Sequence, residues 1–354
     1  MVLTVSAMAE GLRNLPPATE GNRIEITDRV WATTPGEASV CVWKDDRLAA
    51  VSFTIDDNWK ADHQWWLDIT EKYGFKVTWF IVTTAIERNP GFAGTWDDWK
   101  KILDAGHEVQ SHTVTHRGIG DNMPLDEDYG DSIRIIEENL PGNRVRVLAF
   151  PGGGLENDPE IAAKYFIGAR GTVGHINTPG NINYMQTASL GGGITLDEHL
   201  PDGRRQWAYT PDTINPENKK FFRGWTCTHM HGVSNWEGGA EHLEKQFKYL
   251  KEKGDAYWVA PFGEVVQYGQ QRDTATLKVT KNTDKEIAID LTSKMDPKYF
   301  DFPLTVKVCV PKDWKKVAAT QDGKEIESKL VEHEGHKYAF VQIVSGRGEA
   351  KLVP

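Results

Sequence analysis

Short apolar runs alternate with longer amphipathic stretches between about residues 46 and 268. Residues 48–55 form a continuous apolar run typical of a buried strand, and residues 60–73 carry apolar side chains at helical spacing and end before Gly74. The same alternation predicts strands at 75–82, 107–111, 144–150, 166–169, 222–230 and 256–259, and helices at 95–104, 128–139, 159–165 and 238–253. Strands that alternate with helices are parallel and joined by crossovers, and the number of units favours closure into an α/β barrel.

The pattern changes after Tyr268, where short runs of alternating polarity are separated by turn residues. Such runs predict an antiparallel β-sandwich module of roughly eighty residues. The first 45 residues are weakly patterned, and we expect them to pair as edge strands or to lie over the barrel. We therefore divide the chain into an N-terminal extension (1–45), a (β/α) barrel (46–270) and a β-sandwich accessory domain (271–354).

Composition and charge narrow the possible partners. The formal net charge of −10 disfavours nucleic acid and anionic membranes, because neither would be attracted electrostatically. No run approaches about 18 apolar residues, so we expect no membrane span. Residues 1–10 lack the basic start of a signal peptide. We expect an extracellular or periplasmic location, with a cytoplasmic one left open, and the sequence does not predict the oligomeric state.

Two residue types add to this picture. Cys41, Cys227 and Cys309 are too far apart in the sequence for a zinc motif or a disulfide framework, and we interpret them as small buried residues. The 13 tryptophans are a surplus that favours sugar-stacking surfaces, with packing in the core as the alternative.

Chemically interesting groups follow the ends of several predicted strands, and they belong to Asp56, Asp57, His112, Pro151, Gly152, Arg170 and His231. In a parallel α/β barrel this is the face where active sites assemble. One carboxylate and two imidazoles can hold a divalent metal and leave room for water and substrate. The second carboxylate of the Asp pair can then take a proton from that water. A metal-assisted hydrolase is therefore the first hypothesis.

Two motifs resemble those of a known family. Residues 54–58 read Thr-Ile-Asp-Asp-Asn, which is similar to the T-F-D-D-G motif of carbohydrate esterase family 4, the NodB-type polysaccharide deacetylases. Residues 111–116 read Ser-His-Thr-Val-Thr-His and match that family's S-H-[ST]-x-x-H motif. The resemblance covers about residues 46–268. It implies a distorted (β/α) barrel of the NodB deacetylase type.

The resemblance also implies roles for individual residues. The metal ligands would be Asp57, His112 and His116, and the two histidines, four residues apart, would share a face on a helical turn. Asp56 would be the general base. His231 would be the general acid that protonates the leaving group, with His229 as the alternative, because both face the same side of a strand. The ligand types suit Zn²⁺ and also admit Co²⁺, Ni²⁺ or Fe²⁺.

The chain departs from the family pattern in its third and fourth motifs. Ala149 stands where the third motif, R-x-P-Y, has its arginine, and Gly152 stands at the tyrosine position, whose backbone N–H would help to hold the oxyanion. Arg170, at another strand end, is the best substitute for the missing arginine, with an ordinary surface salt bridge as the alternative. No segment matches the fourth motif, and Asn58 replaces a glycine, which left-handed backbone angles still allow.

The function implied is hydrolysis of N- or O-linked acetyl groups on an oligo- or polysaccharide by metal-activated water. Pro151, Trp59 and Trp236 are the candidate substrate-binding residues, and packing is the alternative for each tryptophan. Two rival functions remain open. One is a non-catalytic carbohydrate-binding protein on the same scaffold, and the other is a small-molecule amide hydrolase of the same superfamily.

Overall fold

The computed structural model describes residues 11–17, 26, 28–116, 123–154, 158–236 and 238–354. The chain divides into two compact units. An α/β unit contains residues 41–269 with a segment within 16–31. A β unit contains residues 32–40 and 270–354 with a segment that ends at residue 15.

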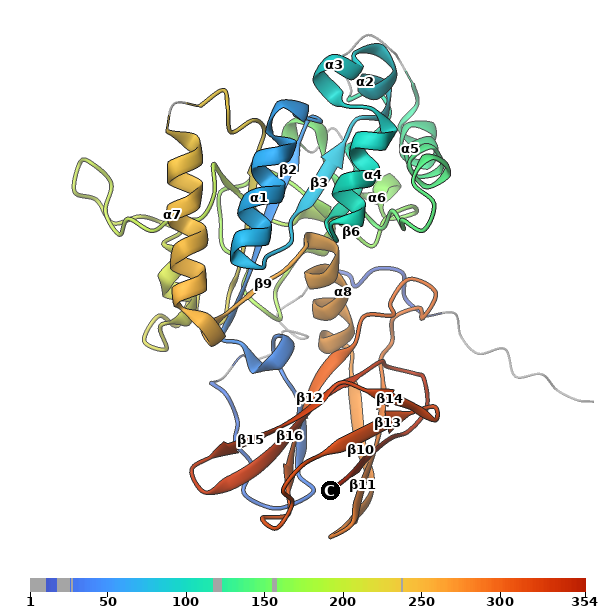
Figure 1. The fold of residues 1–354 in the computed structure, drawn as a ribbon, viewed down its shortest axis with the longest axis vertical. Helices are drawn as coiled ribbons and strands as arrows, with labels where there is room; N and C mark the ends of the chain where they lie inside the picture. Colours follow the sequence, from blue (N-terminus) through green and yellow to red (C-terminus); the bar gives the residue numbers. More distant parts are fainter. Residues whose placement is uncertain (1–10, 18–25, 27, 117–122, 155–157, 237) are drawn as a thin grey trace, which may run out of the picture. The chain divides into compact units, whose positions relative to one another are not determined.

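The α/β unit is built on parallel strands in the order β6-β5-β4-β3-β2-β8-β7. Figure 1 labels β2, β3 and β6 of this sheet. Their bounds are β2 Ala49–Asp56, β3 Thr78–Ile81, β4 Glu108–Ser111, β5 Val147–Ala149, β6 Gly168–Arg170, β7 Leu190–Gly191 and β8 Trp225–Met230. A further strand, β9 (Tyr257–Val259), pairs with the start of β2, while β3 pairs with its end. Thr187 forms a parallel bridge with Arg170, so residues 187–191 connect β6 to β8 and curl the sheet into a distorted barrel.

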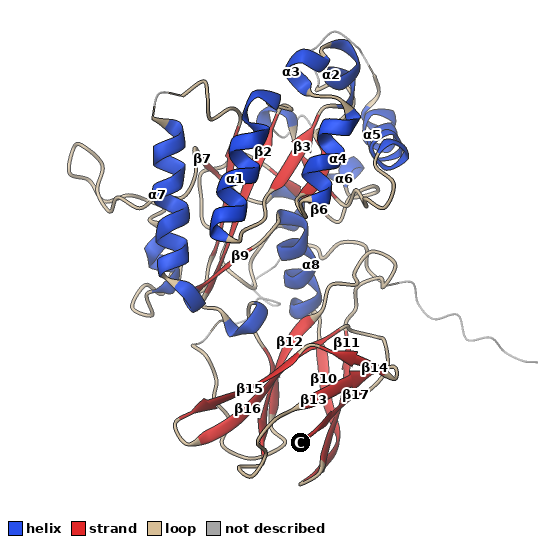
Figure 2. Cartoon of the chain, viewed as in Figure 1, coloured by secondary structure: helices blue, strands red, loops and turns tan. Residues whose placement is uncertain are grey.

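Helices cover the outside of this sheet, and α7, α1 and α4 lie in front of it in Figure 2. The helices are α1 His63–Tyr73, α2 Thr83–Arg88, α3 Pro90–Ala93, α4 Trp96–Asp104, α5 Leu125–Asn139, α6 Pro159–Ala162, α7 Gly239–Glu252 and α8 Phe262–Asp273. Local sequence explains their ends. Gly74 ends α1 in the left-handed conformation that glycine adopts without strain, and Thr95 forms a capping box with Asp98 at the start of α4.

Aromatic side chains fill the space between helices and sheet. Trp66, Trp79 and Trp99 are fully buried there, and their rings contact one another or neighbouring aromatic rings edge to face. Much of the tryptophan surplus therefore packs in the core, which was the alternative to sugar stacking.

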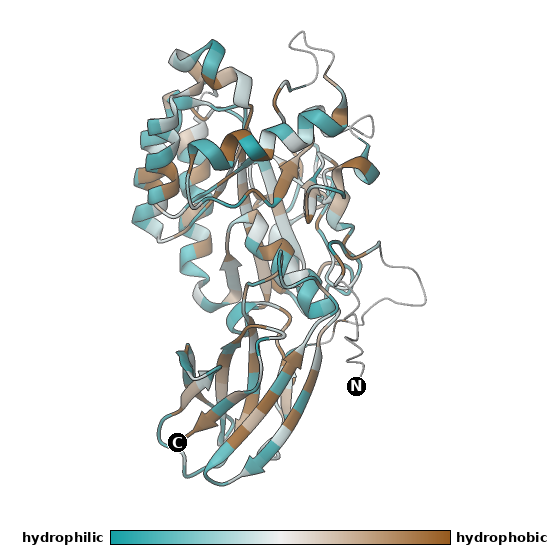
Figure 3. Cartoon of the chain, turned by 90° about the vertical axis from the view of Figure 1, so that its right-hand side faces the viewer, coloured by the Kyte–Doolittle hydropathy of each residue, from teal (hydrophilic) through white to brown (hydrophobic). Residues whose placement is uncertain are grey.

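The β unit consists of two antiparallel sheets, in the orders β1-β12-β16-β15 and β10-β11-β17-β13-β14. Hydrophobic and hydrophilic residues alternate along these strands (Figure 3). The bounds are β1 Ala38–Val40, β10 Thr276–Thr283, β11 Glu286–Thr292, β12 Leu304–Val310, β13 Ala318–Gln321, β14 Lys324–Ile326, β15 Ser328–His333, β16 His336–Ile343 and β17 Ala350–Val353.

The predicted fold class, a distorted (β/α) barrel with an antiparallel β-sandwich module, is confirmed. The weakly patterned start of the chain contributes β1, which pairs as an edge strand with β12. The strands β14, β15 and β17 were not predicted from the pattern. Within the described ranges, no helix is long and apolar enough to cross a membrane.

Candidate active site

The Asp pair lies in a tight turn at the carboxyl end of β2. Asp56 is the last residue of the strand, and Asp57 and Asn58 have φ angles of 62° and 59°. Left-handed angles at two successive non-glycine residues are costly and need support. Asn58 supplies it, because its buried side-chain oxygen accepts a hydrogen bond of 2.7 Å from the backbone N–H of Val82, next to β3. The two carboxylates consequently point to different partners.

The two histidines lie on an irregular loop after β4, so the expected helical turn is wrong. Thr113 and His116 have positive φ angles of 70° and 54°. The buried carboxylate of Asp128, on α5, accepts hydrogen bonds from the backbone N–H groups of Val114 (2.7 Å) and Thr115 (3.0 Å). These side-chain bonds replace those of a helix and fix the loop in another shape.

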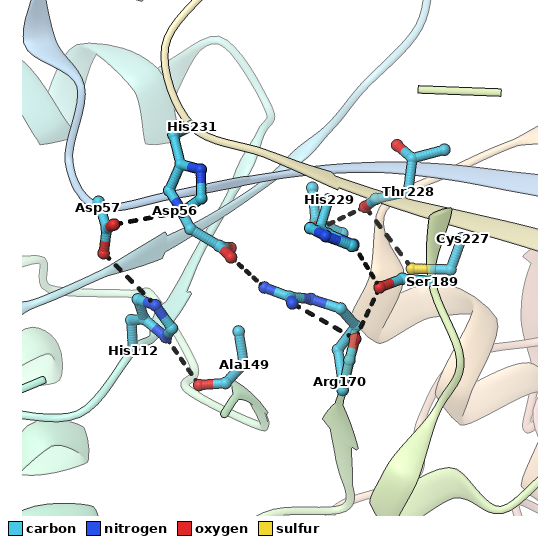
Figure 4. Close-up of polar contacts among 12 residues, drawn as sticks. Asp56, Asp57, His112, Ala149, Arg170, Ser189, Cys227, Thr228, His229 and His231 are labelled. Atoms are coloured by element: carbon cyan, nitrogen blue, oxygen red, sulfur yellow. Dashed lines mark hydrogen bonds and ion pairs between the residues drawn. The ribbon is translucent and has the colours of Figure 1, made fainter. Parts of the chain in front are cut away.

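Asp57, His112 and His116 form a cluster whose donor atoms all lie within 4.8 Å of one another. Asp57 Oδ1 lies 3.5 Å from His112 Nε2 and 3.2 Å from His116 Nε2 (Figure 4 shows Asp57 and His112). His112 Nδ1 donates to the backbone carbonyl of Ala149 at 2.7 Å, since a carbonyl only accepts. Its Nε2 lone pair is therefore directed at the cluster, an arrangement that suits a metal ligand.

Asp56 faces away from this cluster and forms a buried ion pair with Arg170 (Figure 4). Arg170 is fully buried at the end of β6, and its direct register partner on β5 is Ala149. Arg170 on β6 thus lies beside the position on β5 where the third family motif has its arginine. Burial alone would raise the pKa of Asp56, but the charge and hydrogen bond of Arg170, with His112 and His231, outweigh it and hold that pKa below its usual value.

The two candidate acids occupy different environments. His231 follows β8, is half exposed, and places its Nε2 3.4 Å from Asp57 Oδ2. His229 is more buried, and its Nδ1 lies 2.7 Å from Ser189 Oγ. Burial, with the neighbouring Arg170 charge, lowers the pKa of His229 to about 4. His231 is thus the histidine that faces the cluster of Asp57.

The remaining candidates lie on the segments that follow β2, β5 and β8. Pro151 and Gly152 form a short turn after β5, and Gly152 is exposed with a φ of 65° and no atom within 4 Å of where a side chain would begin. Trp59 packs against the backbone of Gly232 and contacts the Phe92 ring at 4.9 Å. Trp236 is 38% exposed and lies over Gly239 and Gly192. Substrate binding by Pro151, Trp59 and Trp236 stays a prediction.

Sequence reasoning missed several supporting residues. Asp128 holds the histidine loop, as described above. Asp62 accepts hydrogen bonds from the backbone N–H groups of Val233 and Ser234, which follow His231. Ser189 contacts His229. The only signal for Asp62 and Asp128 is an acidic residue near a predicted helix start, which ordinarily indicates a favourable helix dipole rather than a contact with a neighbouring loop.

Comparison with known proteins agrees with this geometry. Residues 44–166 match the family model described as polysaccharide deacetylase. That segment contains the Asp pair and both histidines, so this part of the chain is similar to the polysaccharide deacetylases.

Individual relatives extend the comparison. The chain is 36% identical over 364 aligned residues to a protein of Bacillus sp. named gellan lyase, covering 97% of this chain and 14% of that one. It is 24% identical over 135 residues to a protein of Bacillus subtilis strain 168 named as a polysaccharide deacetylase. This alignment covers 37% of the present chain and 47% of that protein. The solved structure of a carbohydrate esterase family 4 pseudoenzyme of Bacillus anthracis superposes on the chain with a TM-score of 0.41 at 18% identity. The superposition covers 62% of the present chain and 66% of the pseudoenzyme. The chain thus spans less than half the length of these two sequence relatives.

Proposed function

We propose that the protein is a metal-dependent hydrolase that removes acetyl groups from a carbohydrate. One observation carries this proposal. The donor atoms of Asp57, His112 and His116 converge within 4.8 Å, directly beside a second carboxylate, Asp56, which Arg170 keeps in its charged form. A metal-ligand set next to a separate ionised base is what hydrolysis by an activated water requires.

The donor set suits a divalent metal. One carboxylate and two imidazoles leave coordination positions open, and His112 already uses its Nδ1 on the Ala149 carbonyl, so its Nε2 is free to bind. Zn²⁺ fits these ligand types best, and Co²⁺, Ni²⁺ and Fe²⁺ also fit. When bound, such an ion supplies a Lewis acid that polarises the acetyl carbonyl and lowers the pKa of water.

The residues of this chain then divide the remaining work. Asp56 accepts the proton of the attacking water, and Arg170 keeps its carboxylate ionised and oriented. The backbone N–H of Gly152 offers a donor for the developing oxyanion, at a position where no atom lies within 4 Å of where a side chain would begin. His231, half exposed beside Asp57, donates a proton to the leaving nitrogen or oxygen.

The substrate we infer is polymeric. The matching family is defined by polysaccharide substrates, and the relative that aligns with nearly the whole chain carries the name of a polysaccharide lyase. Its lyase activity belongs to a much longer protein, of which this chain covers 14%. A polymeric substrate favours a location outside the cytoplasm, where such polymers are met.

Metal analysis and an acetate-release assay test the proposal together. Protein stripped with a chelator should release no acetate from acetylated oligosaccharides, and added Zn²⁺ or Co²⁺ should restore release. Full activity without metal would refute the mechanism. Binding of the glycan without any acetate release would favour a non-catalytic binding protein, and hydrolysis of small amides alone would favour the metabolite hydrolase. Appearance of unsaturated sugar ends would indicate a lyase instead.

A further inference from the structure

A chain of hydrogen bonds leads from His229 to the base Asp56 (Figure 4). His229 Nδ1 lies 2.7 Å from Ser189 Oγ, and Ser189 Oγ lies 2.6 Å from the backbone carbonyl of Gly171. Arg170 NH1 donates to the same carbonyl at 3.4 Å, and its NH2 pairs with Asp56. These hydrogen bonds therefore lead from β8 through the segment before β7 to the end of β6, and from there to β2.

The direction of each bond follows from the chemistry of the groups. The Gly171 carbonyl can only accept, so Ser189 gives it its single hydroxyl proton. The Ser189 oxygen must then accept from His229, which places the imidazole proton on Nδ1. His229 Nε2 carries the lone pair and lies on the side of Gly191, where a side chain would begin 3.5 Å away.

Arg170 depends on this series of hydrogen bonds for its orientation. Its guanidinium is fully buried, and its Nε has no hydrogen-bond partner among the described residues. Its hydrogen bonds there go to the Asp56 carboxylate and the Gly171 carbonyl, and the Phe80 ring lies 5.6 Å away. The carbonyl thus supports Arg170 from the side opposite Asp56. Ser189 in turn fixes the carbonyl, because its short hydrogen bond is the stronger of the two.

We propose that Ser189 and His229 are positioning residues, which hold the Gly171 carbonyl and Arg170 so that Arg170 keeps the base Asp56 oriented. This inference rests on the proposed function. It also explains how an arginine from β6 can serve where Ala149 of β5 supplies none. His229 is then not the general acid, since its Nδ1 proton is engaged with Ser189 and its Nε2 carries none.

A double-mutant cycle tests whether Ser189 acts through Arg170. Ser189→Ala should lower kcat about tenfold, the lower end of what outer hydrogen-bond partners contribute, with KM and bound Zn²⁺ unchanged. Arg170→Met should cost more, and the double variant should be no worse than Arg170→Met alone, since Ser189 then has nothing left to position. Wild-type kcat in Ser189→Ala, or losses that multiply in the double variant, would overturn the inference. Circular dichroism confirms that each variant is folded.

Variants of His229 distinguish positioning from acid catalysis. His229→Asn keeps an N–H donor near Ser189 and should retain most of kcat, whereas His229→Leu removes the donor and should match Ser189→Ala. His231→Asn is the matched control and should lose about 10²–10⁴-fold, as a removed general acid does. If His229→Asn loses as much as His231→Asn, His229 is the acid and the proposal fails.

Nitrogen-15 NMR of the histidine rings supplies a readout that needs no activity. The wild-type spectrum near neutral pH should show His229 as a neutral ring protonated on Nδ1, and Ser189→Ala should shift that signal. A ring protonated on Nε2 would overturn the hydrogen-bond chain even in an active enzyme. If the wild-type protein releases no acetate from any glycan, the proposed function fails, while this spectrum still decides the geometry around His229.

Discussion

Asp128 offers the sharpest test of how the candidate site is held together. Its carboxylate is fully buried and accepts from the backbone N–H groups of Val114 and Thr115 and from Thr115 Oγ1 at 3.1 Å. The segment it holds lies between His112 and His116. Replacing Asp128 therefore perturbs both histidines of the candidate cluster without touching either one.

The expected size of the effect follows from the unpaired groups. Asp128→Ala leaves two buried backbone N–H groups without acceptors, at about 1–3 kcal/mol each, and predicts a loss of about 2–6 kcal/mol in the free energy of unfolding. Asp128→Asn keeps one oxygen, which can still accept, and should cost about 1–2 kcal/mol. Looser histidines should also weaken Zn²⁺ binding by about 10–100-fold, the usual effect of removing an outer partner.

Chemical denaturation and calorimetric Zn²⁺ titration of Asp128→Ala, with Asp128→Asn as the milder variant, measure both effects. Asp126→Asn is the matched control, because Asp126 lies in the same first turn of α5 but is exposed and pairs only loosely with Lys164, at 3.6 Å. The control should unfold and bind Zn²⁺ like the wild type. If Asp128→Ala binds Zn²⁺ as tightly as the control does, the loop does not depend on Asp128 and the reasoning is refuted.

Three further predictions concern other parts of the α/β unit. Asp56→Asn should keep the metal and lower kcat by about 10²–10⁴-fold, whereas Asp57→Asn should lower the metal content. Elemental analysis measures the metal in both variants, and the reverse pattern would exchange the two assigned roles. Burial lowers the pKa of His107 from 6.5 to about 4, so stability should fall as pH drops from 6.5 to 4, by about 3 kcal/mol for this group. Denaturation of His107→Asn across that range should show a correspondingly shallower decline, and an equal decline would contradict the assignment. Gly232→Ala would place a methyl group 2.1 Å from Trp59 Nε1, so the loop after His231 must shift and kcat should fall with the metal retained. Unchanged kcat would show that this packing does not position the acid.

Much of the fold follows from the sequence, because each helix or strand reveals its buried face through the spacing of apolar residues within its own stretch of sequence. The apolar run at 48–55 became β2 and the amphipathic stretch at 95–104 became α4, with Thr95 as its cap. The short strand β17 has a weak pattern and pairs with β11 and β13, far along the chain, while β14 is only three residues long and pairs with β13 across a two-residue turn. Pattern alone could not identify them.

In the candidate site, too, residues with a local motif were predictable and residues that depend on distant partners were not. Asp56, Asp57, His112 and His116 were predicted from local motifs, and the structure brings the last three together as one cluster. Whether Arg170 faced Asp56 or solvent was left open, because the answer depends on the register between β5 and β6, which no local signal encodes. Ser189 had no signal for a similar reason, since its partners come from two other segments.

The strand β1 has a consequence for the order in which the chain can fold. Its residues 38–40 pair with residues 306–308 of β12, so nearly the whole α/β unit is inserted between two hydrogen-bonded neighbours of one sheet. A ribosome synthesises the chain from its N-terminus, so β1 emerges long before its partner exists. The α/β unit can collapse first, while the β unit must wait for its last strands. A polypeptide shortened to begin at residue 46 would leave that edge of β12 permanently open, and we expect it to self-associate.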